Sequence, residues 1–256
     1  LDAVYYPAFQ LALKGAETLA VTDCLNFGNP QKPEIMSEFV ASVEAIAKAS
    51  QALNAPVISG NVSFYNETIG ENIISTPATG LVAIRESVDD LIPDQFQDPF
   101  ESILTVKLPW IESWIYIDQF HNKTSRFVMR DNFDVVEFIK RCSKLETYFK
   151  DNQKKVSSIK AIGLGGLAST CLKMCTSEVG FDLSYDMAQN AESDLLKDVF
   201  YSFVLVTKEK AESVEQLLNT YFSGLGVEVR KVGETTSKTI KFKNEVSLDY
   251  LEFSTR

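Results

Sequence analysis

Ala55-Pro-Val-Ile-Ser-Gly-Asn-Val-Ser-Phe-Tyr-Asn-Glu-Thr68 joins a short apolar run to a dense set of polar side chains. Val57 and Ile58 are β-branched and predict a buried strand that ends near Gly60. Because glycine has no Cβ, a ligand can approach the backbone closely there. Oxygen-bearing side chains follow within seven residues, at Asn61, Ser63, Asn66 and Glu67. Such a thiol-free set suits Mg²⁺ and phosphate esters, although a polar turn after a strand is also an ordinary turn.

A second stretch has the same organisation. Leu19-Ala-Val-Thr-Asp-Cys-Leu-Asn-Phe-Gly-Asn-Pro30 is an apolar strand that reaches Asp23 and then an Asn/Gly-rich turn. One helix separates the two stretches, which predicts a strand-loop-helix-strand unit with both polar ends on one rim. Ligands in such units bind at strand ends and helix N-termini, where unpaired N–H groups face outward.

The motifs TDCLNFGNP (22–30) and PVISGNVSFYNET (56–68) identify a family. In this order and separation they resemble the C-terminal half of phosphoribosylformylglycinamidine synthase, in the aminoimidazole ribonucleotide (AIR) synthetase-like superfamily. The resemblance is close over residues 10–86 and looser beyond.

The resemblance implies an ATP-dependent ligase of purine biosynthesis with Mg²⁺ and ATP at its site. ATP would phosphorylate the amide oxygen of formylglycinamide ribonucleotide, and ammonia from glutamine would displace the phosphate. The resemblance assigns ATP binding to Asp23 and Gly60, metal binding to Asn61 and substrate binding to Ser63. Asn66 and Glu67 would support these residues, with capping of the turn as an equal alternative.

The same resemblance places the family's catalytic histidine and its ATP-binding lysine in an N-terminal half. His121 does not match that motif, so no catalytic residue is assigned here and the chain alone is expected to be inactive. The first residue is Leu1, and the family's initial glycine-rich strands are absent, which favours a fragment. Expected partners are that N-terminal half, a glutaminase subunit or domain, and a second copy of this chain.

Composition excludes several other classes of protein. The chain has 256 residues, 45% of them hydrophobic, which is enough for a substantial core. Its net charge of −10 argues against non-specific binding to nucleic acids or anionic membranes. No signal peptide and no apolar run of about 18 residues is visible, so a cytoplasmic location is expected.

Periodicity predicts two domains of mixed α+β or α/β class. The first, 1–90, has predicted helices at 2–14 and 34–53 and predicted strands at 18–23, 56–59 and 79–84, and the resemblance implies that it is an incomplete AIR-synthetase-like first-type domain. The acidic segment 88–98 marks the boundary. The second, 91–256, is predicted to be an α/β sandwich, and the resemblance implies that it is of the AIR-synthetase C-terminal type. Its predicted strands are 103–108, 181–184, 201–206, 227–231 and 239–242, and its helices are 133–149, 209–221 and one ending near Cys175.

The segment Ile159–Ala168 departs from the family pattern. Gly165, Gly166 and Leu167 match an Asp-Val-Ser-Asp-Gly-Gly-Leu-type signature, whereas Ile162, Gly163 and Leu164 replace its polar residues. We expect tight packing of a helix on a strand there in preference to phosphate binding. The aromatic stretch Trp110–Met129 is assigned only as partly strand.

Two alternatives to a ligase remain. One is a non-catalytic half that supplies nucleotide binding and dimer contacts. The other is a thiol or metal sensor built on Cys171 and Cys175, which lie one helical turn apart. A zinc site needs further ligands, so reduced thiols are expected at all four cysteines.

Overall fold

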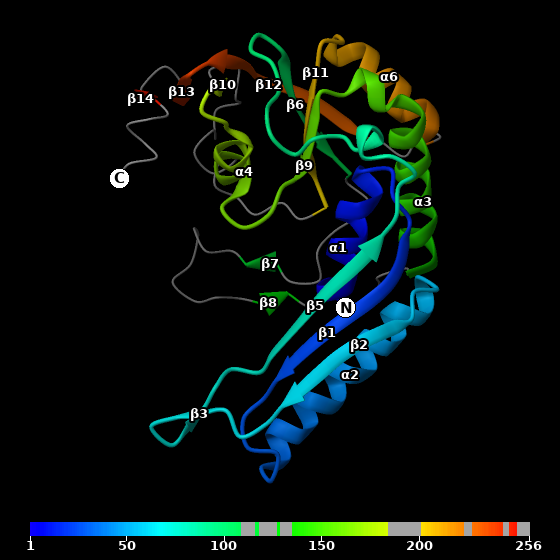
Figure 1. Cartoon of the computed structure of the whole chain (residues 1–256), viewed down its shortest axis with the longest axis vertical. Coiled ribbons are helices and arrows are strands. Elements are labelled where there is room, and N and C mark those ends of the chain that lie inside the picture. Colours follow the sequence, from blue (N-terminus) through cyan, green and yellow to red (C-terminus); the bar gives the residue numbers. More distant parts are fainter. Residues whose placement is uncertain are drawn as a thin grey trace. The chain divides into compact units, whose positions relative to one another are not determined.

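The computed structural model describes residues 1–108, 135–183, 201–222 and 227–242, and the short strands 116–117, 127–128 and 246–249. Figure 1 shows the order of the elements along the chain. The chain divides into two compact units. The first contains residues 1–12, 16–86 and 134–143, and the second contains 13–15, 87–133 and 144–256. The long helix α3 (Val135–Asn152) thus contributes its first residues to one unit and its last to the other.

The first unit is built on a three-stranded sheet in the order β2-β1-β5. Its elements are α1 (Asp2–Leu13), β1 (Thr18–Asn26), α2 (Pro33–Ala52), β2 (Val57–Ser63), the hairpin β3 (Glu67–Thr68) and β4 (Glu71–Asn72), and β5 (Thr76–Ala83). Strands β1 and β2 are parallel, joined by α2, and β5 is antiparallel to β1. The predicted strand-helix-strand unit is therefore present, and Figure 1 shows α2 running alongside β2.

An aromatic cluster ties α2 to the ends of both parallel strands. The ring of Phe39 on α2 lies 5.3 Å from that of Phe27 after β1 and 5.0 Å from that of Phe64 after β2, measured between centroids. Phe27 is fully buried, as is Val21 within β1. Edge-on ring packing of this kind favours one orientation of the helix over the strand ends.

Strand β2 is an exposed edge. Its residues Val57, Ile58 and Val62 have exposed fractions of 44%, 62% and 49%. Pro77, expected at a strand start or on an edge, occupies the second position of β5, the opposite edge strand. An apolar edge strand with unpaired backbone groups is a surface that another strand can pair with.

The second unit is built on a seven-stranded sheet in the order β14-β13-β10-β12-β6-β11-β9. Its strands are β6 (Ser102–Lys107), β9 (Ser158–Ala161), β10 (Val179–Leu183), β11 (Phe203–Thr207), β12 (Glu228–Ser237), β13 (Thr239–Phe242) and β14 (Val246–Asp249). Its helices include α4 (Gly166–Met174) and α6 (Ala211–Tyr221). All neighbouring strands in this sheet pair antiparallel except β10 and β13.

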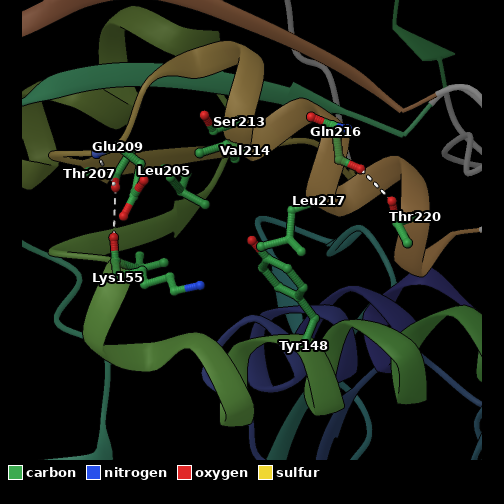
Figure 2. A pocket seen from close by; sticks show the side chains of 11 residues that line it. Tyr148, Lys155, Leu205, Thr207, Glu209, Ser213, Val214, Gln216, Leu217 and Thr220 are labelled. Carbon is green, nitrogen blue, oxygen red and sulfur yellow. Dashed lines mark hydrogen bonds between the residues drawn. The ribbon is translucent and has the colours of Figure 1, made fainter.

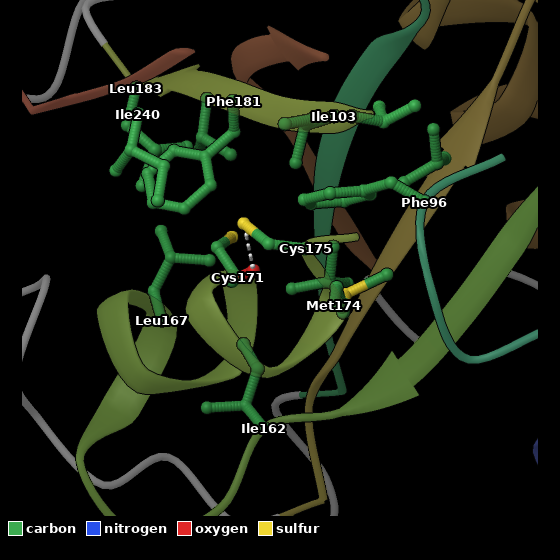
Figure 3. Packing of buried hydrophobic residues seen from close by; sticks show 14 residues of the cluster. Phe96, Ile103, Ile162, Leu167, Cys171, Met174, Cys175, Phe181, Leu183 and Ile240 are labelled. Carbon is green, nitrogen blue, oxygen red and sulfur yellow. Dashed lines mark hydrogen bonds between the residues drawn. The ribbon is translucent and has the colours of Figure 1, made fainter. Parts of the chain in front are cut away.

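Both faces of β11 are covered. Val204 and Val206 belong to a buried apolar cluster with Leu167, Cys171 and other α4 residues, which Figure 3 shows beneath the sheet. Phe203 faces the other way and packs on Phe149 of α3, at 5.7 Å between ring centroids. Because side chains alternate along a strand, five consecutive buried residues require a layer on each side. The predicted α/β sandwich is confirmed.

Several strand limits were predicted wrongly. Both strands of the parallel pair run past the predicted ends, to Asn26 and Ser63, because the ladder continues through their polar residues. Pairing with β5 likewise extends to Asn26 and Thr76. Hydrogen bonding to neighbouring strands thus overrides the turn preference of Asn and Gly. Strand β9 and the β3–β4 hairpin were not predicted.

No helix within the described residues is long and apolar enough to cross a membrane. His121 and most of Trp110–Met129 lie outside the described residues. Within that stretch, β7 (Tyr116–Ile117) and β8 (Phe127–Val128) pair antiparallel.

Candidate functional site

The polar residues of the two motifs occupy adjacent positions in the parallel ladder. Asp23 is paired with Gly60, and Asn26 with Ser63. Asn61 stands opposite Cys24 between them. These residues lie near the same ends of β1 and β2, within the paired part of the strands and not in loops beyond them.

Gly60 makes room for the carboxylate of Asp23. A Cβ at position 60 would lie 2.1 Å from Asp23 Oδ1, a distance that no side chain tolerates. The missing side chain was expected to admit a ligand to the backbone, and the structure shows that it admits the neighbouring acid. The Asp23 carboxylate consequently lies over the edge strand β2.

The side chains of Asp23 and Asn61 leave the sheet on opposite faces. Residues 60 and 61 are consecutive in a strand, so their side-chain directions alternate, and Asp23 shares the side of Gly60. Asn61 is exposed, and Ser63, two residues further on, shares its face. A ligand that contacts both Asp23 and Asn61 must therefore pass around the open edge of β2.

Asn66 holds the segments after the two strands together. Its Nδ2 donates to the carbonyl oxygens of Phe27 and Ser63, at 2.9 Å each. The backbone N–H of Asn66 donates to the same Phe27 carbonyl at 3.2 Å, and that of Phe27 donates to the Ser63 carbonyl at 2.9 Å. Of the two roles open to Asn66, the structure gives it the turn-forming one.

Glu67 lies in the exposed hairpin that follows. It pairs with Asn72 across β3 and β4. Asn72 was not singled out in the sequence, yet its Oδ1 accepts the backbone N–H of Asn29 at 2.9 Å. A Cβ on Gly28 would lie 2.4 Å from the same oxygen. The glycine of the first motif thus accommodates Asn72, a contact between residues 44 positions apart that no local pattern reveals.

The donors at this rim fit a magnesium-bound phosphate. Asp23 offers a carboxylate, Asn61 a neutral amide oxygen and Ser63 a hydroxyl. Mg²⁺ takes one or two protein oxygens and fills its remaining positions with phosphates and water. No group of three or more His, Cys, Asp and Glu in the described part of the chain could hold a metal ion on its own. The carboxylate, amide and hydroxyl oxygens of this set suit Mg²⁺ carried by a nucleotide, with phosphates and water as its remaining ligands.

The glycine-rich segment in the second unit serves packing. Gly165 precedes α4 with φ of +83°, and a Cβ there would lie 2.6 Å from the Cβ of Ser169. Leu167 is buried in the apolar cluster, while Leu164 is exposed. These observations agree with the expected packing of helix on strand.

The cysteine pair lies in the same apolar cluster. Cys171 and Cys175 are buried, and the Cys175 thiol donates to the Cys171 carbonyl at 3.3 Å (Figure 3). Burial raises the pKa of the Cys175 thiol to about 12 and that of Cys171 further. Since the thiolate is the reactive and metal-binding form, this environment opposes the sensor alternative. None of the four cysteines forms a disulfide bond in the structure.

Most of the first unit matches a known protein family. Residues 3–82 match the family model described as "AIR synthase related protein, N-terminal domain". The chain is 30% identical over 241 residues to the phosphoribosylformylglycinamidine synthase subunit PurL of Campylobacter hominis, covering 93% of this chain and 31% of that protein. The PurL subunit of Methanobrevibacter smithii is 31% identical over 248 residues, covering 94% and 34%.

Solved structures show the same fold. Thermotoga maritima PurL complexed with FGAR has a TM-score of 0.60 at 14% identity, covering 99% of this chain and 44% of that chain. A HypE–HypF complex chain has a TM-score of 0.55 at 14% identity, covering 96% and 82%.

The chain thus spans about one third of the length of the curated relatives it matches. Similarity to PurL subunits extends over nearly all of this chain, and both units follow the fold of solved PurL structures. The chain belongs to the AIR synthase-related superfamily, as a PurL-related member.

Proposed function

We propose that this chain forms part of a phosphoribosylformylglycinamidine synthase, an ATP-dependent carbon–nitrogen ligase. The observation that carries the proposal is the pairing of Asp23 with Gly60, one position before Asn61 and three before Ser63, on adjacent parallel strands. It agrees with the relatives, whose solved structures include T. maritima PurL complexed with FGAR and with ATP.

Each residue has a distinct part in this proposal. The Asp23 carboxylate, directed over Gly60 to the edge of β2, holds the ATP–metal assembly. The exposed Asn61 gives its amide oxygen to the metal, and Ser63 hydrogen-bonds the amide substrate. Asn66 keeps the two strand ends in register through its bonds to Phe27 and Ser63.

Bound Mg²⁺ would neutralise the negative charge that spreads over the transferring phosphoryl group. The protein's own contribution is positioning, which sets the rate of phosphoryl transfer to a large extent. We also infer that turnover needs the part of the relatives' length that this chain does not span, where the resemblance places the catalytic histidine and the ATP-binding lysine.

ATP binding in the presence and absence of Mg²⁺ tests the proposal. Calorimetric titration of the chain with ATP is expected to give saturable binding that depends on Mg²⁺, with Asp23→Asn and Asn61→Ala each weakening it about tenfold or more. Asp89→Asn and Gln51→Ala, matched changes at exposed positions, should leave it unchanged. Binding that ignores Mg²⁺, or that all four variants affect equally, contradicts the proposal.

A ligase assay separates the activity from simple binding. With ATP, formylglycinamide ribonucleotide and ammonium, the chain alone is expected to show no turnover. Addition of the region of a PurL relative that this chain does not span should give turnover. In that mixture, Ser63→Ala should raise KM for the amide substrate. Turnover by the chain alone would contradict the division of roles.

A second function, strand pairing with a partner, is favoured by the exposed apolar edge of β2. The partner would be the N-terminal half of the enzyme or a second copy. Light scattering tests for the copy: a dimer that Ile58→Lys dissociates supports pairing at this edge, whereas a dimer unaffected by Ile58→Lys contradicts it. The exposed Ile74→Lys is the matched control.

A further inference from the structure

A cavity in the second unit lies between α3, α6 and the end of β11, whereas the two motifs belong to the first unit. Its volume is about 320 Å³, and its walls come from Tyr148, Lys155, Leu205, Thr207, Glu209 and several α6 residues (Figure 2). Leu205, Val214 and Val156 are buried and form an apolar floor. This size and mixture of surfaces is typical of small-molecule sites, which range from about 300 to 1,000 Å³.

Tyr148 presents a hydroxyl to this cavity. The residue is 3% exposed, and its ring is held edge-on by Phe149 and Tyr221, each at 5.0 Å between centroids. Its hydroxyl forms no hydrogen bond within the described residues, and Figure 2 shows it directed between the helices. Burial raises the pKa of Tyr148 to about 12, so the hydroxyl remains a donor at neutral pH.

Two oppositely charged residues, Lys155 and Glu209, border the cavity, and the Thr207 hydroxyl forms hydrogen bonds with the backbone of both. Thr207 Oγ1 donates to the carbonyl of Lys155 at 2.7 Å and accepts the N–H of Glu209 at 3.0 Å. The backbones that carry the ammonium and the carboxylate are thereby held close to each other. Figure 2 shows the Lys155 side chain extending toward Tyr148. Neither Lys155 nor Glu209 forms an ion pair within the described part of the chain.

We infer that this cavity binds a free α-amino acid with an apolar side chain. The ligand's carboxylate would accept from Lys155 and from the Tyr148 hydroxyl, its ammonium would face Glu209, and its side chain would lie on Leu205 and Val214. A zwitterion satisfies both protein charges at once, whereas a simple anion would be repelled by Glu209 and a simple cation by Lys155. This site is independent of the proposed ligase activity.

Titration calorimetry with L-leucine, L-methionine and L-phenylalanine on the whole chain tests the inference. At least one is expected to bind saturably with a Kd of about 1 mM or tighter. 4-Methylpentanoate, which lacks the ammonium, and 3-methylbutylamine, which lacks the carboxylate, should each bind about tenfold or more weakly than leucine.

Three conservative variants connect binding to this cavity. Tyr148→Phe, Lys155→Met and Glu209→Gln are each expected to weaken amino-acid binding about tenfold. Lys154→Met and Glu212→Gln, changes at nearby exposed positions that do not line the cavity, are the matched controls. Lys155 and Glu209 are exposed, so their variants should fold even if Tyr148→Phe does not, and circular dichroism verifies this.

Three results would overturn the inference. The first is that none of the amino acids binds, and the second is that binding is indifferent to the three cavity variants. The third is that 4-methylpentanoate binds as well as leucine, which would identify a site for simple carboxylates. ATP binding at the motifs is measured in a separate titration. If no ATP binds, the amino-acid titration still tests the cavity.

Discussion

Gly60 and Asp23 show how one missing side chain positions a charged one. Because residue 60 has no Cβ, the Asp23 carboxylate lies over β2, where an alanine methyl group would be 2.1 Å from its Oδ1. The two residues are neighbours in the ladder though 37 positions apart in the chain. The parallel pairing thus brings them close enough for a substitution at one to affect the other.

Replacement of Gly60 by alanine should therefore be costly only when Asp23 is present. Gly60→Ala is expected to lower the free energy of unfolding by about 1–3 kcal/mol. In an Asp23→Ala background the same change should cost less than about 1 kcal/mol, because the obstructing atoms are gone. Urea denaturation of the four proteins measures the coupling. Equal costs in both backgrounds would show that the clash is relieved elsewhere.

The segments that follow the two parallel strands act as one element. Asn66 joins them through three hydrogen bonds to backbone carbonyls, two from Nδ2 and one from its own N–H. The hairpin that follows returns Asn72 to the same place, where it accepts the N–H of Asn29. The side-chain amides of Asn66 and Asn72 thus hold the backbone at the rim of the candidate site, in addition to the strand pairing.

Asn66→Ala is expected to lower the free energy of unfolding by about 1–3 kcal/mol, because two backbone carbonyls lose their side-chain donor. Glu67→Gln, at the next and exposed position, should change it by less than about 0.5 kcal/mol. Thermal or urea denaturation distinguishes them. Similar effects for both variants would contradict the structural role given to Asn66.

The turn of the β3–β4 hairpin contains an unfavourable residue. Ile69 and Gly70 have φ of +53° and +79°, the signs that a type I′ turn requires, and Ile69 is fully exposed. A β-branched residue is disfavoured in this conformation, whereas Asn is common there.

Ile69→Asn should therefore stabilise the hairpin, by about 0.5–1 kcal/mol. Hydrogen exchange reports this locally, because the Ile73 N–H donates to the Asn66 carbonyl at the base of the hairpin. Its exchange is expected to slow by about two- to fivefold. Ile74→Asn, at another exposed isoleucine without a positive φ, is the control and should have no effect. Faster exchange in Ile69→Asn would contradict the turn assignment.

At the scale of the whole molecule, a half-buried lysine makes stability depend on pH. Lys14 Nζ donates to the carbonyls of Ile92 and Ile159, at 2.7 and 2.9 Å. Burial lowers the pKa of Lys14 from 10.5 to about 8. The Asp94 carboxylate acts against this shift, and the Lys160 ammonium adds to it. Between these two pH values the unfolded chain binds more protons than the native one, so this group's contribution to stability rises with pH.

The difference in unfolding free energy between the wild type and Lys14→Met should accordingly rise by about 1–3 kcal/mol from pH 8 to 10. Tyr5, Tyr6 and Tyr148 act in the opposite sense above pH 10, since burial raises the pKa of each to about 12. Their effect is common to both proteins and cancels in the difference. Denaturation of both proteins at a series of pH values measures this difference in unfolding free energy. A difference that does not change with pH would contradict the lowered pKa of Lys14.

Local sequence was sufficient for the fold class, the strand-helix-strand unit and the helices, because their apolar periodicity and β-branched runs reflect which faces become buried. The two motifs also indicated which residues gather at one rim. The sequence could not reveal that those polar residues belong to the strands, that Gly60 accommodates Asp23, or that Asn72 returns to Gly28. Nor could it reveal the cavity between α3 and α6. Each of these depends on pairing or packing between residues distant in the chain, and such contacts leave no periodic trace in the segments that make them.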